Sequence, residues 1–160
     1  MRRRDVLAFV PLSVSLGWAM PARAHHGWSS FDQGRPIYLE GVVKRMAWRN
    51  PHAELELELP TSGLSLPADL ASRALPPQSA PVDGPALLKA VQLPTRKDRR
   101  WQIELAPLSR LQAWQVPEIK NGDRVALLGF TFTGEKGDPV LRVEYLFLGG
   151  KTYGLRSSPA

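Results

Sequence analysis

The stretch that decides the fold is residues 37–59, IYLEGVVKRMAWRNPHAELELEL. Its first part, Ile37–Trp48, is rich in β-branched and aromatic residues and predicts a strand. Ile37, Leu39 and Val43 share one parity, whereas Met46 and Trp48 take the other. Because a strand that changes its buried face contains a bulge, we expect one near Lys44-Arg45.

A second strand follows the turn signal Arg49-Asn50-Pro51. In His52–Leu59, HAELELEL, the leucines face one side, and His52 and the three glutamates face the other. This alternation is typical of a half-buried strand. The glutamates lie about 7 Å apart along one face. They do not converge as the ligands of a calcium ion would, so we expect a solvated outer face.

Further elements follow along the chain. Alternation predicts a strand over Trp101–Leu105. Apolar runs bounded by turn signals predict strands over Arg124–Thr133 and Val140–Leu148, with a short last strand possible over Lys151–Leu155. Leu108–Trp114 is a short helix candidate because its apolar residues recur at helical spacing. The predicted fold class is therefore all-β with one short helix.

Five strands with a short helix before the fourth are typical of a small Greek-key barrel of the OB type. Gly41 supports this prediction because a residue without a side chain permits the sharp coiling that a small barrel needs. An open antiparallel sandwich or sheet is the alternative.

Residues 60–99 form a Pro-rich insertion between the second and third strands. Seven of the fifteen prolines lie between residues 60 and 94. Since such a segment cannot hold a regular ladder, we expect a long, partly disordered loop. Short helical turns can form over Asp69–Ala74 or Pro85–Val91.

Residues 1–24 read as a signal peptide. Arg2-Arg3-Arg4 is followed by a mostly apolar stretch, Val6–Met20, and by Ala22-Arg23-Ala24, which fits the pattern of a cleavage site. Both a general secretory leader and a twin-arginine leader fit these residues. We therefore expect a periplasmic protein whose single OB-like domain spans residues 25–156. No later apolar stretch approaches the roughly 20 residues of a membrane span, so no membrane attachment is expected after cleavage.

Charge and composition exclude several function classes. The 160-residue chain has a formal charge of +6, but four arginines and one aspartate lie in residues 1–24, which leaves +3 for residues 25–160. This weak charge does not favour nucleic acid as a partner. The absence of cysteine excludes disulfides and thiolate metal sites. Hydrolase and phosphate-loop motifs are also missing, so we predict no catalytic residues.

The chain resembles a family of small exported bacterial proteins, catalogued as domain of unknown function 6152. Seven sequence features carry the resemblance: His25-His26 after an alanine, Phe31-Asp32, Gly41-Val42-Val43, Trp48-Arg49-Asn50-Pro51-His52, Trp101 with Glu104, the short helix Leu108–Trp114, and Gly122-Asp123-Arg124-Val125. The resemblance implies export and an OB-like barrel, and it implies no established activity. The Pro60–Arg100 insertion is longer than the short hairpin of the family.

Cleavage after Ala24 would make His25 the new N-terminus. Its α-amino group and imidazole can both be deprotonated near neutral pH. Together with one more imidazole, from His52 or His26, they make a three-nitrogen set that suits copper(II). Against this metal site stands a simpler interpretation, in which His25 and His26 are flexible and His52 stabilises a turn.

The remaining candidates for ligand contact are Trp28, Trp48 and Asn50. The two tryptophans flank the histidines in the sequence and could form the wall of a pocket. Trp101 and Trp114 are expected in the core.

Two functions follow from these observations. The first is a periplasmic, non-enzymatic OB-like module that binds a small ligand or a partner protein. The second is a periplasmic copper-binding protein that uses His25 with His52 or His26.

Overall fold

The computed structural model describes residues 27–160, so the leader, His25 and His26 lie outside the described residues. The strands are β1 (Ile37–Ala47), β2 (Glu54–Glu58), β3 (Arg100–Glu104), β4 (Arg124–Phe130), β5 (Val140–Leu148) and β6 (Lys151–Gly154). The helices are α1 (Gly84–Ala90) and α2 (Leu108–Ala113), with 3-10 turns η1 (Trp28–Ser30), η2 (Leu70–Ser72) and η3 (Thr133–Glu135). Among these helices, none has the length and apolar character that crossing a membrane requires.

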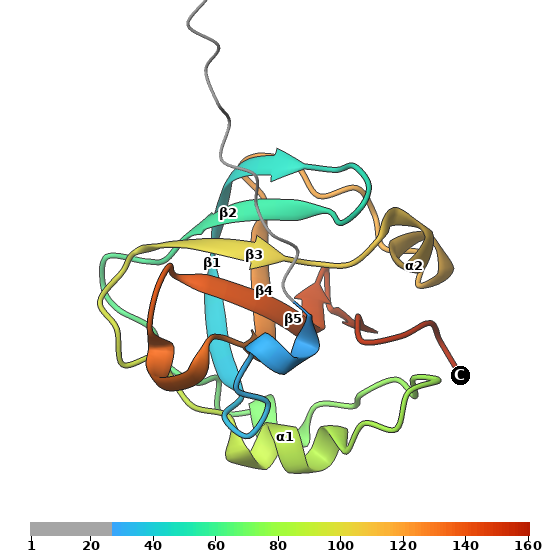
Figure 1. Ribbon diagram of the computed structural model, residues 1–160, viewed down its shortest axis with the longest axis horizontal. Coiled ribbons are helices and arrows are strands. Elements are labelled where there is room, and N and C mark those ends of the chain that lie inside the picture. The colour runs from blue at the N-terminus through green and yellow to red at the C-terminus, as the bar shows by residue number, and fades with distance from the viewer. Residues whose placement is uncertain (1–26) are drawn as a thin grey trace, which may run out of the picture.

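Five of the strands close into a barrel (Figure 1). β1 pairs antiparallel with β2 and β4, β2 pairs with β3, and β4 pairs with β5. A parallel ladder between β3 and β5 closes the ring, with Gln102 opposite Val140 and Glu104 opposite Arg142. α2 connects β3 to β4, and β6 extends the sheet beside β5. This arrangement confirms the OB-like barrel and contradicts the open sheet.

β1 carries the predicted bulge. Its register against β2 shifts between Val43 and Arg45. As a result Lys44 and Arg45 are exposed, while Met46 packs against the core. The bulge therefore lets one strand contribute inward side chains along both of its halves.

Two glycines allow neighbouring backbones to approach closely. A Cβ atom on Gly41 would lie 2.3 Å from the carbonyl oxygen of Glu58, and one on Gly129 would lie 2.2 Å from that of Arg142. No side chain fits at either distance, so glycine is needed where β1 and β4 coil against their neighbours.

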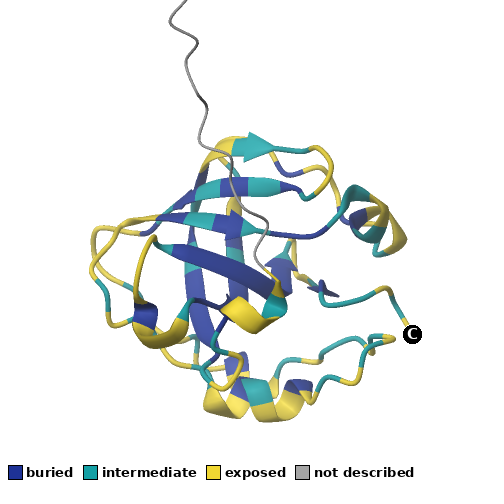
Figure 2. Ribbon diagram, in the orientation of Figure 1, coloured by how far each residue is buried: buried dark blue, intermediate teal, exposed yellow. Residues whose placement is uncertain are grey.

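The inward side chains of all five strands form the barrel core. Figure 2 marks buried residues along each of these strands. The leucines of the HAELELEL stretch are buried, and Trp101 is fully buried, both as predicted. Trp114 is only half-buried: it lies at the edge of the core and donates from Nε1 to the carbonyl oxygen of Ser157 at 2.8 Å.

The insertion is more ordered than its composition predicted. η2 lies within the expected stretch Asp69–Ala74, and α1 overlaps the expected stretch Pro85–Val91 but begins one residue earlier. Leu70 and Leu88 from these turns are buried in a second apolar cluster, outside the barrel, with Tyr38, Tyr145 and Phe147. α1 covers the lower side of the barrel in Figure 1. Scattered leucines thus hold the proline-rich segment in place, because they bury the outer face of β1, β4 and β5.

A buried carboxylate fixes the C-terminal end of the insertion. Glu135 accepts hydrogen bonds from the backbone N–H groups of Thr95 (3.0 Å) and Arg96 (2.9 Å) and forms an ion pair with Arg35. Burial acts to raise its pKa, but these three donors outweigh it and lower the pKa of Glu135 to about 2.

The lowered pKa of Glu135 predicts that the stabilisation from its carboxylate is lost in acid. Since the folded state lowers the pKa, the carboxylate stabilises the fold above the ordinary value of 4.5, and the stabilisation is lost as the pH falls toward about 2. Glu135→Gln should lower the free energy of unfolding at pH 7 by roughly 2–3 kcal/mol. Urea unfolding between pH 7 and pH 2 measures the free energy of unfolding of the wild-type protein and of the variant. The difference between the two should become smaller as the pH falls. Glu118→Gln, at an exposed carboxyl, is the control, and a difference independent of pH would contradict the assignment.

The close approach of β1 and β2 at Gly41 predicts that any larger residue at this position destabilises the fold. Gly41→Ala should destabilise the protein by about 1–3 kcal/mol, because β1 and β2 must separate to admit the methyl group. Gly34→Ala is the matched control, since its nearest neighbour would lie 3.5 Å away. Thermal unfolding compares the two variants, and equal midpoints would show that the barrel tolerates a wider strand separation.

Candidate functional site

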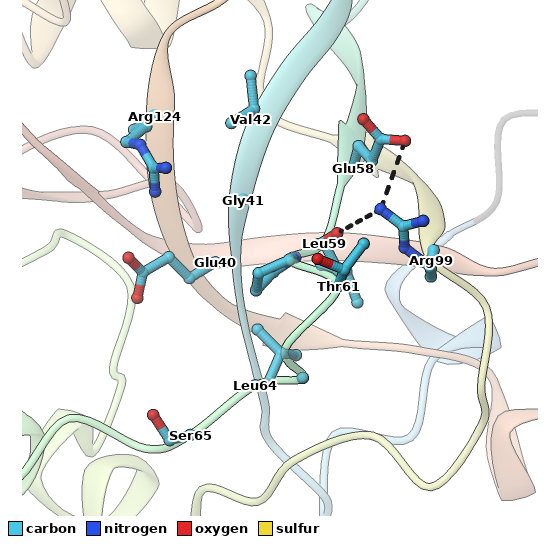
Figure 3. A pocket seen from close by; sticks show the side chains of 12 residues that line it. Glu40, Gly41, Val42, Glu58, Leu59, Thr61, Leu64, Ser65, Arg99 and Arg124 are labelled. Atoms are coloured by element: carbon cyan, nitrogen blue, oxygen red, sulfur yellow. Dashed lines mark hydrogen bonds and ion pairs between the residues drawn. The ribbon is translucent and has the colours of Figure 1, made fainter.

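A cleft opens on the outer surface of the barrel beside β1. It is lined by residues 40–42 of β1, by residues 58–61 and 63–65 at the start of the insertion, and by Arg99 and Arg124. Its volume is about 310 Å³, at the lower end of the range of small-ligand pockets. In Figure 3, Glu40 and Arg124 lie on one side of β1, and Glu58, Arg99, Thr61 and Leu64 lie on the other.

A second hollow of about 510 Å³ adjoins the cleft. The two share Glu40 and Arg124. Tyr38, Arg73 and Phe147 form part of the second hollow, with Lys151 at the β5–β6 turn. The two hollows therefore offer one continuous surface with both apolar and charged parts.

The carboxylates of this surface are already engaged. Glu58 pairs with Lys44 at 2.7 Å and with Arg99 at 3.7 Å. The Lys44 hydrogen bond lowers the pKa of Glu58, although partial burial opposes the shift. Glu40 accepts a hydrogen bond from the Tyr38 hydroxyl at 2.8 Å. Burial, assisted by this hydrogen bond, raises the pKa of Tyr38.

Arg124 differs from these residues. Its side chain is exposed, and within residues 27–160 its guanidinium makes no hydrogen bond or ion pair. Arg124 lies on β4 opposite Val42 of β1, so its place beside the cleft is set by the β1–β4 ladder. An unpaired guanidinium at the junction of two hollows suits an anionic group of a ligand.

The outward glutamates predicted to be solvated form ion pairs. Glu56 lies 3.6 Å from Arg45 and 3.4 Å from Arg100, and Glu54 accepts a hydrogen bond from Gln102 at 3.2 Å. The outer face of β2 is thus partly exposed, as predicted, but neutralised by its neighbouring strands.

The predicted metal ligands are not brought together within the described residues. His25 and His26 lie outside them. His52 is half-buried in the loop between β1 and β2, where it takes part in an interaction of its own. In residues 27–160, no group of three or more metal-ligating side chains occurs. Copper binding at His25 with His52 or His26 stays a prediction.

Trp28 is held by the protein's own cations. The Arg156 guanidinium lies 3.7 Å from the centroid of the Trp28 ring, and that of Arg142 lies 5.3 Å away. Phe130 contacts the same ring edge-on at 6.3 Å. Each arginine also pairs with a carboxylate, Arg142 with Glu104 and Arg156 with the fully buried Glu144. This assembly anchors η1 against β5.

Trp48 and Asn50 lie elsewhere. Trp48 follows β1, is half-buried and packs against the barrel core. Asn50 is exposed in the β1–β2 loop, and its peptide bond to Pro51 is cis. This loop is at the upper right of Figure 1, away from η1. The structure therefore brings Trp48 and Asn50 onto the same loop region but does not join them with Trp28.

Sequence reasoning missed the cleft. Its residues come from two strands and the insertion, and only the closed barrel places them side by side. One signal was available: Pro60 directly follows the second strand, and a proline cannot continue a ladder from a central position.

A closed five-stranded barrel with a helix between β3 and β4 defines a small OB-like β-barrel protein. Residues 14–65 match the family of unknown function DUF6152, which confirms the resemblance stated above over η1, β1, β2 and the start of the insertion. No curated protein matches the chain.

The contacts of Arg156 with Trp28 and Glu144 predict that the stability of the protein depends strongly on Arg156. Arg156→Met should destabilise the protein by about 2–4 kcal/mol, because Glu144 would keep only Gln78 as a hydrogen-bond partner inside the structure. Arg45→Met removes an exposed, longer ion pair with Glu56 and should cost about 0–0.5 kcal/mol. Chemical unfolding of both variants measures the difference. Similar losses would show that the Arg156 contacts do not anchor η1.

Proposed function

We propose that the protein is an exported, OB-like binding module that holds its ligand in the cleft beside β1. The observation that carries the proposal is Arg124, an exposed guanidinium that is unpaired within the described chain and lines both hollows. Arg99, which also lines the cleft, has a carboxylate partner, as do Arg45 and Arg100. An unpaired cation in a concave site favours binding of an anionic group.

The pKa shifts of Glu58 and Tyr38, two side chains of the joined hollows, support binding rather than catalysis. General acids and bases work best with a pKa near the working pH. Here the Lys44 contact lowers the pKa of Glu58, and burial raises the pKa of Tyr38, so both groups move away from neutrality. These two side chains of the joined hollows are therefore suited to fixed hydrogen bonding and ion pairing, and not to proton transfer.

Export and a periplasmic location form part of the proposal. Support comes from the leader pattern of residues 1–24. The family match begins at residue 14, so it includes residues 14–24 of that pattern.

The proposal predicts that small carboxylates bind in the cleft and shift the NMR signals of the residues that line it. The probes are acetate, succinate and glutarate, with the corresponding amides as neutral controls, added to 15N-labelled protein recovered after export. NMR shifts should concentrate at Glu40–Val42 and Thr61–Ser65 and should be larger for the acids. Arg124→Gln should weaken binding by about tenfold, whereas Arg45→Gln, outside the cleft, should leave it unchanged.

Two outcomes would contradict this proposal. Shifts spread evenly over basic surface residues would indicate general electrostatic association. An unchanged affinity in the Arg124→Gln variant would remove the residue on which the proposed site depends.

A further inference from the structure

The cleft and the second hollow share two opposite charges that do not pair with each other. Glu40 and Arg124 line both hollows. In the β1–β4 ladder Glu40 lies opposite Ala126 and Arg124 lies opposite Val42, so the two charged residues are diagonal neighbours on the outer face of the barrel. Residues in this relation are about 7–8 Å apart. Both side chains lie on the same side of β1 in Figure 3, and no ion pair joins them.

A hydrogen bond from Tyr38 holds the Glu40 carboxylate away from Arg124. The Tyr38 hydroxyl donates to Oε2 of Glu40 at 2.8 Å. Along β1, Tyr38 and Val42 lie on opposite sides of Glu40, and Arg124 is the residue opposite Val42. The carboxylate is therefore bonded toward the part of the strand that is further from the guanidinium. Within residues 27–160 it forms no ion pair, so its negative charge is not neutralised there by a contacting cation.

Ala126 leaves room between the two charges. It lies directly opposite Glu40 on one side and opposite Phe147 on the other, and Arg124 is two residues away on the same strand. All four residues line the second hollow. Because the side chain of Ala126 is only a methyl group, a ligand above it meets a carboxylate, a guanidinium and an aromatic ring.

The other charged groups of the two hollows are paired or lie further from Glu40. Asp69 pairs with Arg73 at 2.9 Å, and Glu58 pairs with Lys44 at 2.7 Å. Lys151 also lines the second hollow, but it lies on β6, which β4 and β5 separate from β1. A ligand at the junction of the hollows therefore meets one negative and one positive group that the protein itself leaves unpaired.

We propose that the joined hollows bind a small zwitterion, a molecule with one carboxylate and one ammonium group, of the amino acid class. Its carboxylate binds the Arg124 guanidinium, which suits the geometry of a carboxylate. Its ammonium group donates to the Glu40 carboxylate and supplies the missing positive charge. Glu40 also disfavours a second carboxylate on the ligand, because like charges repel. This inference rests on the proposed binding function and specifies the chemical class of its ligand.

The test compares each amino acid with the carboxylate that lacks its ammonium group. The pairs are glycine with acetate, β-alanine with propionate, and γ-aminobutyrate with butyrate, and each is titrated by NMR into the protein recovered after export. At least one amino acid should bind about tenfold more tightly than its matched carboxylate, because it adds a hydrogen bond between two charged groups. Butylamine, which lacks the carboxylate, should bind more weakly than γ-aminobutyrate.

Three variants assign the two charges. Glu40→Gln keeps an acceptor for the Tyr38 hydroxyl but removes the negative charge, so the preference for the amino acid should disappear while the plain carboxylate binds at least as well. Glu56→Gln, on the outer face of β2 and outside both hollows, is the matched control and should keep the preference. Arg124→Gln should weaken the amino acid and the carboxylate alike, by about tenfold.

The outcomes separate this inference from the proposed function. If small carboxylates bind through Arg124 and no ammonium group improves their affinity, the zwitterion is wrong and the binding module stands. A preference for the amino acid that survives in Glu40→Gln would show that the ammonium group binds elsewhere. Tighter binding of succinate or glutarate than of every amino acid would also contradict the inference. Failure of carboxylates and amino acids together would overturn both proposals.

Discussion

The parallel ladder between β3 and β5 closes the barrel, and the rest of the structure depends on that closure. Parallel pairing requires a long connection, which α2 and β4 provide. The same register places Glu104 beside Arg142 on the outer surface, where they form an ion pair with Nε and Oε2 at 2.9 Å. Arg142 in turn lies over Trp28 and Phe31. Closing the barrel therefore also builds the surface on which η1 is anchored.

β5 explains why so much of the chain lies outside the barrel. From Val140 to Phe147 every residue is buried, so both faces of this strand are covered. The outer face receives Trp28 from one side, Arg156 from the C-terminal segment, and Leu70 and Leu88 from the insertion. A five-stranded barrel alone would leave these apolar side chains in water, which is unfavourable by about 25 cal/mol per Å². The insertion and both ends of the domain remove that cost.

The sequence predicted the parts of the fold that depend on local patterns. Alternation identified β2 and β3, and the parity change in β1 located the bulge at Lys44-Arg45, because these signals repeat within a few residues. The ordered packing of residues 60–99 was missed because it depends on the outer face of β5, and VLRVEYLFL was treated only as a strand. Its lack of alternation was the available signal, since a strand covered on both faces reads as continuously apolar. The cleft was missed because Arg124 and Glu40 become neighbours only through the β1–β4 register.

Pro60 links the fold to the candidate site. A residue with an N–H at this position could continue the β1–β2 ladder and close over Glu40, and the segment after β2 would then follow the strand. Proline ends the pairing, and the chain turns at Gly63, whose φ of 87° is favourable only for residues such as glycine. The turn carries Thr61 and Leu64 to the rim of the cleft. Proline thus ends the β1–β2 ladder at Val42 and Glu58 and, by redirecting the chain, opens the cleft beside Glu40.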